Sequence, residues 1–456
     1  MSKFGEGVID PRARWHLLPE MVRRFARTFA LGTLCLSACD APLEQQTRVC
    51  FVPEELDTSI MVAADDEQVE ALRGCRIIEA TLSIGSAVTS LEPLHQLEQV
   101  DALWIRGNEE LVDLRGLESL RLADALKLSD NTALETLDGL GAMIGLTEVL
   151  VEDNPQLRSL AGLAGLQLSA FEERSKPKIN IERNPMLTEL DGLASLLSNS
   201  ARPTVVIRSE QPLDLAPLAA RSDYEGLGLA GPSLRNFEAL AQLRSARSIS
   251  FYETALRDLQ PLRGLESLES LSVNTSEAFE SLAGLDPELG VERLSLSGLP
   301  ALTSPPDTPL SVSFELRLEQ LPGLVDASAL QLRPDPLDAL TILRVEDCAS
   351  LSTLPQFVGG DRLGHLELRG TGLTHLSELA SVVEVEWSTV IWDNPLLDQG
   401  LAEAWAAQHT TPFTRIGQNL GWVEPAECPW LEDGYCDAPS YCADDWVDCQ
   451  PPPQGS

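Results

Sequence analysis

Pairs of apolar residues separated by one position recur along most of the chain, and in the clearest cases the pair is followed by an asparagine and then by leucine. Four segments show this spacing without gaps: LWIRGNEEL (103–111), LKLSDNTAL (126–134), VLVEDNPQL (149–157) and INIERNPML (179–187). Apolar residues with a period of two indicate a short strand with one buried face. The asparagine amide can hydrogen-bond the backbone of the following turn, where a strand ladder no longer supplies partners.

The asparagine position returns at intervals that are mostly 22 or 23 residues long. The anchor positions are Asn108, Asn131, Asn154, Asn184, Glu210, Pro232, Thr254, Ser276, Leu299, Leu321, Cys348, Thr371 and Asn394. This period and spacing are the signature of leucine-rich repeats, whose stacked coils share one core because a single coil cannot bury its own leucines. Residues 75–420 are therefore predicted to form an α/β-type solenoid. We expect a right-handed coil with one long parallel sheet and an irregular or short helical convex side.

The repeats resemble those of bacterial leucine-rich-repeat surface proteins, especially the receptor L domain. The family's habit of Asn-Pro-x-Leu followed by Leu-x-Gly-Leu is present at 154–163 and again at 184–193. The segment 89–103 (TSLEPLHQLEQVDAL) resembles the repeats of internalin-type proteins instead. The resemblance implies recognition of a protein or glycan partner.

The strand register also predicts which side chains point outward. Outward positions of the middle coils are small or polar, and those of the next three coils are charged: Arg317 and Glu319, Arg344 and Glu346, Glu367 and Arg369. The charges are expected to pair across neighbouring strands. Exposed aromatics on a concave sheet are natural contact anchors. The candidate ligand-binding residues are Trp104, Tyr252, Ser272, Asn274, Ser295 and Trp392; an ordinary solvated sheet face is the alternative.

The first residues carry an export signal. Three arginines at 23–27 precede a short apolar run that ends in Leu36-Ser37-Ala38-Cys39, an arrangement typical of a secretory signal. The ending resembles the bacterial lipobox, which implies that Cys39 receives lipid. We predict a signal peptide over 1–38, with Met21 as the alternative start, and a lipidated tether and N-terminal cap over 39–74. The membrane would be reached through the lipid on Cys39, and the outer membrane or the cell surface is the expected location.

An exported protein meets an oxidising compartment, so its paired cysteines are expected to form disulfides. Cys50 and Cys75 bracket the start of the repeats, and their bridge would contribute roughly 3 kcal/mol by constraining the unfolded chain. Cys348 occupies an asparagine position of the repeat, where a buried structural thiol is expected rather than a nucleophile.

A separate acidic, cysteine-rich module is expected over 421–456. Its segment CPWLEDGYCDAPSYCADDWVDC (428–449) cannot form a sufficient hydrophobic core, so disulfides or a metal must help it fold. Its four cysteines allow three connectivities. The segment resembles the Notch repeat, which implies Cys428–Cys442 and Cys436–Cys449 bridges and a calcium ion held by Asp437, Asp445 and Asp448. An acidic disulfide module without metal is the alternative.

The chain has 70 acidic and 33 basic residues and a formal net charge of −37, which disfavours nucleic-acid binding. Its five histidines show no metal-ligand spacing, and nucleophile-elbow and phosphate-loop motifs are absent. We therefore expect a non-catalytic, surface-displayed lipoprotein without a cofactor, apart from possible calcium in the module. It would recognise a protein or glycan; the alternative is a structural or scaffolding protein of the cell envelope.

Overall fold

The computed structural model describes residues 49–50, 59–169, 176–198, 200–286, 288–303, 309–333, 341–409 and 411–422. The described residues form two compact units that divide between Ala220 and Arg221. Every strand pairing in both units is parallel.

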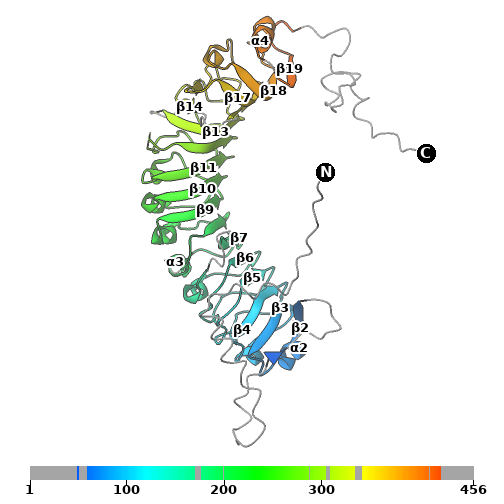
Figure 1. Ribbon diagram of the computed structural model, residues 1–456. Coiled ribbons are helices and arrows are strands. Elements are labelled where there is room, and N and C mark those ends of the chain that lie inside the picture. Colours follow the sequence, from blue (N-terminus) through cyan, green and yellow to red (C-terminus); the bar gives the residue numbers. More distant parts are fainter. Residues whose placement is uncertain are drawn as a thin grey trace, which may run out of the picture. The chain divides into compact units, whose positions relative to one another are not determined.

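In the first unit, short strands alternate with turns and brief helices (Figure 1). The strands are β1 (Val49–Cys50), β2 (Ile60–Asp65), β3 (Ile77–Ala87), β4 (Gln99–Arg106), β5 (Ala125–Ser129), β6 (Glu148–Glu152), β7 (Lys178–Glu182) and β8 (Thr204–Arg208). The helices are α2 (Asp66–Ala71) and α3 (Leu193–Ser198), with 3₁₀ turns η3 (Glu92–Leu94), η4 (Ala161–Gly165) and η5 (Ala216–Ala220). From β3 to β8 each strand pairs with the next strand in chain order.

The second unit repeats this plan. Its strands are β9 (Asp223–Ala230), β10 (Ser245–Tyr252), β11 (Ser267–Asn274), β12 (Val291–Ser297), β13 (Leu310–Glu319), β14 (Leu330–Leu332), β15 (Thr341–Glu346), β16 (Gln356–Phe357), β17 (Arg362–Arg369), β18 (Glu384–Trp392) and β19 (Phe413–Gly417). Its helices are η6 (Phe237–Gln242), η7 (Gln260–Leu262), η8 (Ser377–Leu379) and α4 (Gln399–Ala406). β13 pairs with β15 and β15 with β17, while β14 and β16 form a short second ladder beside the start of β13.

The core of each unit is aliphatic and follows the predicted spacing. In the coil that begins with β4, the inward residues Leu103 and Ile105 are fully buried. Leu111, Leu114 and Leu117 follow at three-residue steps and are at most 1% exposed. Burying a leucine side chain stabilises a fold by roughly 1.5–3 kcal/mol, so repetition of this pattern supplies most of the driving force. Together with the parallel register, it confirms the leucine-rich-repeat fold in both units.

The asparagine positions form a buried ladder of hydrogen bonds. In the first unit Asn108, Asn131, Asn154 and Asn184 are at most 5% exposed. The Oδ1 atom of each later asparagine accepts a hydrogen bond from the backbone N–H of the asparagine one coil earlier, at 3.0–3.2 Å. The second unit continues the row only in part, with Thr254 donating to Ser276 and Thr371 to Asn394. At the anchor positions of Leu299 and Leu321 a buried leucine takes the place of the polar side chain, and Pro232 is exposed. Asn419, which the repeat pattern did not include, continues the row from Asn394.

The residue before an anchor often adopts a left-handed backbone conformation, which sequence reasoning did not predict. Asp130, Asp153 and Asp347 have φ of 58°, 54° and 53°. This conformation is uncommon for residues other than glycine, although aspartate and asparagine tolerate it best. It turns the chain so that the side-chain amide of Asn154 donates to the carbonyl oxygen of Glu152 at 2.8 Å. The turn and the ladder therefore stabilise each other.

The predicted Cys50–Cys75 disulfide is confirmed. It joins β1 to the turn before β3, and β1 and β2 pair with different parts of β3. The helix α2 begins after Asp65, whose side chain accepts a hydrogen bond from the Gln68 backbone N–H at 2.9 Å. Val69 of α2 is fully buried. The start of the first unit is thus held by a covalent bridge and a capped helix in addition to its strands.

Candidate interaction face

The outward side chains at the carboxyl ends of β9–β12 form an uncharged surface in the second unit, which we call the serine strip. Its members are Gly228, Ala230, Ser250, Tyr252, Ser272, Asn274, Ser295 and Ser297. The register places Ser250, Ser272 and Ser295 in one row and Tyr252 and Asn274 in the next. The inward neighbours of these residues are apolar and buried, so the alternation of the strands fixes which side chains point outward.

Tyr252 is the large side chain of the serine strip and is 38% exposed. Its register partners are Ala230 on β9 and Asn274 on β11, both smaller than tyrosine. The amide nitrogen of Asn274 donates to the hydroxyl of Ser272 at 2.6 Å. The predicted outward orientation of Tyr252, Ser272, Asn274 and Ser295 agrees with the register, and the three smaller residues are half-buried. Whether they bind a ligand stays a prediction.

The next strands carry a charged block on the same face of the sheet. Its members are Glu315, Arg317, Glu319, Arg344, Glu346, Glu367 and Arg369, on β13, β15 and β17. The guanidinium of Arg344 contacts the Glu367 carboxylate across the strands at 2.7 Å, as predicted. Other ion pairs run along a strand, such as Arg317 with Glu315 at 2.8 Å. The block therefore satisfies much of its own charge.

Two carboxyls of the charged block have shifted pKa values in opposite directions. Burial and the nearby charge of Glu367 raise the pKa of Glu346 above its ordinary value. Burial also acts to raise the pKa of Glu367, but the contact with His365 and the charge of Arg344 outweigh it and hold this pKa below its ordinary value. Glu367 is thus the carboxylate that the block stabilises in its ionised form.

A chain of polar contacts extends the charged block to β18. The Nδ1 atom of His365 lies 2.6 Å from the hydroxyl of Ser388, and its Nε2 atom lies 3.3 Å from Glu367. Since Glu367 also contacts Arg344, both nitrogens of the imidazole and the carboxylate are engaged by neighbours. This network fixes side chains on the sheet face. Sequence reasoning missed it because its members are 23 residues apart and meet only through strand pairing.

Trp104 lies on the outward face of β4 in the first unit and is half-buried. Two cations lie near its ring, with Arg106 at 5.7 Å and Lys127 at 5.8 Å from the ring centroid. Lys127 also contacts Glu148 at 2.7 Å. Nearby cations are attracted to the negative face of an indole ring and restrain it. The structure thus supports the predicted orientation of Trp104 but fills part of its surroundings with the protein's own side chains.

The predicted exposure of Trp392 is wrong. Trp392 does occupy the outward row, as the register partner of Arg369 and Gly417, yet it is only 2% exposed. Its ring packs against Gly417, where a β-carbon would lie 2.5 Å from the indole. Arg415 stacks over the ring at 4.6 Å, and Trp422 lies 6.1 Å away between centroids. Side chains from the following coil therefore cover the position.

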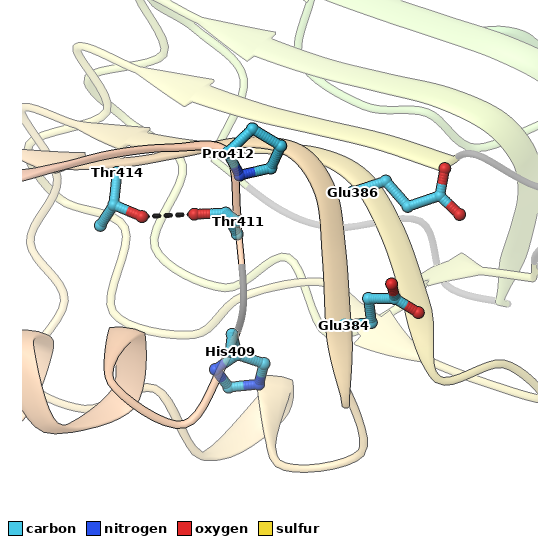
Figure 2. Close-up of a pocket in the computed structure, with 6 residues that line it drawn as sticks. All are labelled: Glu384, Glu386, His409, Thr411, Pro412 and Thr414. Atoms are coloured by element: carbon cyan, nitrogen blue, oxygen red, sulfur yellow. Dashed lines mark hydrogen bonds between the residues drawn. The ribbon is translucent and has the colours of Figure 1, made fainter.

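A hollow of about 620 Å³ lies beside the starts of β18 and β19. Figure 2 shows Glu384 and Glu386 on one side of it and His409 on another. Both glutamates contact Arg362. The two ring nitrogens of His409 lie 2.7 Å and 2.9 Å from backbone carbonyl oxygens, and the ring stacks on Trp405. These polar groups are engaged in holding the last coil together, so the hollow offers no chemistry of its own.

Cys348 is fully buried, as predicted for a structural thiol. Its Sγ atom lies 3.3 Å from the carbonyl oxygen of Glu346 and 3.6 Å from that of Leu318, where an asparagine amide donates in other coils. Burial raises the pKa of the Cys348 thiol to about 12. A thiol that is not ionised near neutral pH is a poor nucleophile.

Several predicted sites lie outside the described residues. These are the lipidated Cys39, the bridges Cys428–Cys442 and Cys436–Cys449, and the calcium ligands Asp437, Asp445 and Asp448. Within the described ranges, no group of three or more histidine, cysteine, aspartate or glutamate side chains is placed to hold a metal ion. In the same ranges no helix is long and apolar enough to cross a membrane.

No protein-family model matches the chain, and no curated protein is similar to it in sequence. Among solved structures, the chain is similar to an internalin, InlF, from Listeria monocytogenes. The two sequences are 16% identical, the alignment covers 65% of this chain and 78% of the internalin, and the TM-score is 0.34. The fold assignment rests on this chain's own strand register and anchor ladder.

Proposed function

We propose that this chain is a non-catalytic recognition protein of the cell envelope, which binds a protein or glycan partner through the outward face of the sheet in its second unit. The serine strip is the observation that carries this proposal. It is uncharged although the chain has a net charge of −37, and it adjoins a block whose charges pair with one another. Tyrosine, serine, glycine and asparagine, its main residue types, also dominate antibody paratopes.

Export and lipid anchoring belong to the same proposal. They are supported by the arginine-rich start, the apolar run and the Leu36-Ser37-Ala38-Cys39 ending. The Cys50–Cys75 disulfide adds independent support, because such bridges persist mainly in oxidising compartments. Surface display would leave the strand face accessible to a partner. Lipidation is checked by radiolabelled palmitate incorporation, which should be lost in Cys39→Ala.

The test is to place a large charge on the serine strip without touching the core. Immobilised wild-type protein and its Ser272→Arg variant would be incubated with envelope extract, and the retained components quantified by mass spectrometry. Gln242→Arg provides a matched control, since Gln242 is an exposed residue of η6. We expect Ser272→Arg to lose a component that both wild type and control retain, with unchanged thermal unfolding. Equal retention by all three proteins would refute the proposal, and an accompanying envelope defect in a deletion strain would favour a scaffolding role instead.

A further inference from the structure

The last coil of the second unit, which contains β19, has one side that no further coil covers in the described part of the chain. We infer that residues 423–456, the acidic cysteine-rich segment that follows in the sequence, pack over this side. The contact would close the end of the second unit and is independent of the serine strip. Three features support it: the exposure of the last coil, the point from which the segment starts, and the apolar residues that the segment carries.

The inward side chains of β19 are accessible to solvent, although those of the preceding strand are not. Ile416 pairs in register with Ile391, which is fully buried, yet Ile416 itself is only half-buried. Thr414 is exposed, whereas its register partner Thr389 is 1% exposed. Each coil of a repeat array is covered by its neighbours. The core positions of β19 therefore lack the cover that every earlier coil receives from the next one.

Two leucines near this end of the second unit are exposed as well. Leu420, in the turn after β19, is 52% exposed, and Leu401 of α4 is 38% exposed. The backbone N–H of Leu420 donates to the carbonyl oxygen of Leu397 at 2.8 Å, so the turn that carries Leu420 is fixed to the previous coil. Apolar surface left in water costs roughly 25 cal/mol per Å² relative to burial. A segment that covered these leucines together with Ile416 would recover that free energy.

The start of the first unit shows the effect of such a cover. There the inward residue Ala63 of β2 is 1% exposed, and α2, which follows β2 directly, buries Val69 completely. The Cys50–Cys75 bridge adds a covalent link at the same place. A short segment that adjoins the terminal strand in sequence is thus sufficient to bury the inward face of that strand. β19 is also adjoined by a short segment in sequence, but on its carboxyl side.

Residues 423–456 are the occupant that the chain itself provides. The described part of the last coil runs to Trp422, whose ring lies 6.1 Å from that of Trp392 between centroids, so the segment starts directly beside the exposed side chains. A short tether gives a segment an effective concentration on the order of millimolar at a neighbouring surface. A second copy of the chain or a separate partner has no such advantage.

The segment carries apolar residues that need a surface to pack on. Its pairs Trp430-Leu431 and Trp446-Val447 lie among four cysteines and six carboxylates within 428–449. So short a segment cannot bury two tryptophans in a core of its own. Packing the two pairs against the exposed leucines of the last coil would remove both apolar surfaces from water, while the carboxylates stay in solvent.

The experiment measures amide hydrogen exchange in the full chain, with mass spectrometry of peptides that cover β19 and β17. We expect the β19 amides to exchange about tenfold faster in a Trp430→Ala/Trp446→Ala double variant than in the wild type, because the cover is released. Leu420→Glu, which alters the last coil and leaves the segment intact, should have the same effect. The β17 amides should be unchanged in both variants, which distinguishes loss of the cover from general unfolding.

Trp387→Ala is the matched control, because Trp387 is an exposed tryptophan of the same unit that lies outside the segment. It should leave exchange in β19 unchanged. The inference is overturned if the β19 amides of the wild type exchange as fast as those of the double variant, or if Leu420→Glu has no effect. It is also overturned if protection of β19 rises with protein concentration and sedimentation velocity shows a dimer, since a second copy would then be the cover.

Discussion

The side-chain amide nitrogen of Asn131 donates to Oδ1 of Asn154, one coil later, at 2.9 Å. The same nitrogen donates to the carbonyl oxygen of Ile105, in the strand one coil earlier, at 3.0 Å. One buried side chain therefore links three successive coils. Such links satisfy backbone groups that the strand ladder no longer reaches, which explains why a polar residue recurs inside an otherwise aliphatic core.

Replacing Asn131 by alanine should destabilise the protein strongly. The substitution removes the donor to Ile105 and the acceptor for the Asn108 backbone N–H, so buried polar groups lose their partners. We expect a loss of about 2–4 kcal/mol in the free energy of unfolding, measured by urea denaturation. Asn180→Ala is the control, because Asn180 lies half-buried on the outward face of β7 and should change stability by less than about 0.5 kcal/mol. Equal losses in the two variants would contradict the ladder's role.

Replacing Trp392 by alanine should act on stability rather than on recognition. The ring is enclosed by Gly417, Arg415 and Trp422, so its removal leaves a cavity. Truncation of a buried tryptophan typically costs about 3–5 kcal/mol. Trp387→Ala, at an exposed position of the same strand, should unfold close to the wild type. A Trp392 variant with normal stability would show that the ring is not part of the core.

Cys348 should resist alkylation for as long as the second unit stays folded. Burial raises its pKa to about 12, so the reactive thiolate is scarce near pH 8. Peptide mass spectrometry after iodoacetamide treatment should find Cys348 unmodified in native protein and modified in denaturant. Rapid labelling of Cys348 in the native protein would show that the thiol is accessible.

Asp101 should make stability depend on pH. Burial, with repulsion from Asp124 and Glu79, raises the pKa of Asp101 above its ordinary value. The folded state therefore disfavours the ionised form, so stability is greatest below the unfolded pKa and falls as pH rises through the folded pKa. Asp101→Asn should raise the Tm near neutral pH, and this gain should vanish in acid. Asp138→Asn, at an exposed position, is the control; a gain that persists in acid would exclude this cause.

The coils, the direction of the strands and the Cys50–Cys75 bridge could be predicted from the sequence because each depends on local spacing. A period-two pair followed by a short polar residue defines one coil, and the repeat length then sets the register between neighbours. That reasoning correctly placed Cys348, whose Sγ atom contacts a neighbouring carbonyl oxygen as an asparagine amide does. It was wrong for Glu210 and Pro232, which it placed at anchor positions and which are exposed.

Other features depend on residues that meet only after folding. Trp392 has an outward strand position in sequence, but the side chains that cover it come from Arg415 and Trp422 in the next coil. The contact of His365 with Ser388 likewise needs the pairing of β17 with β18, which shifts in register before His365. The second ladder pairs β14 with β16, and both strands are too short for an alternating pattern to be recognised in the sequence.

Along β9–β12, buried and outward residues alternate, so that folding and the proposed recognition depend on different side chains. The buried set holds the coils together, and the outward set stands on the opposite face of the same strands. Substitutions among the outward residues would therefore leave the folding free energy nearly unchanged. Related proteins with this fold could therefore come to bind different partners through a few substitutions of outward residues. None of these substitutions would prevent the chain from folding.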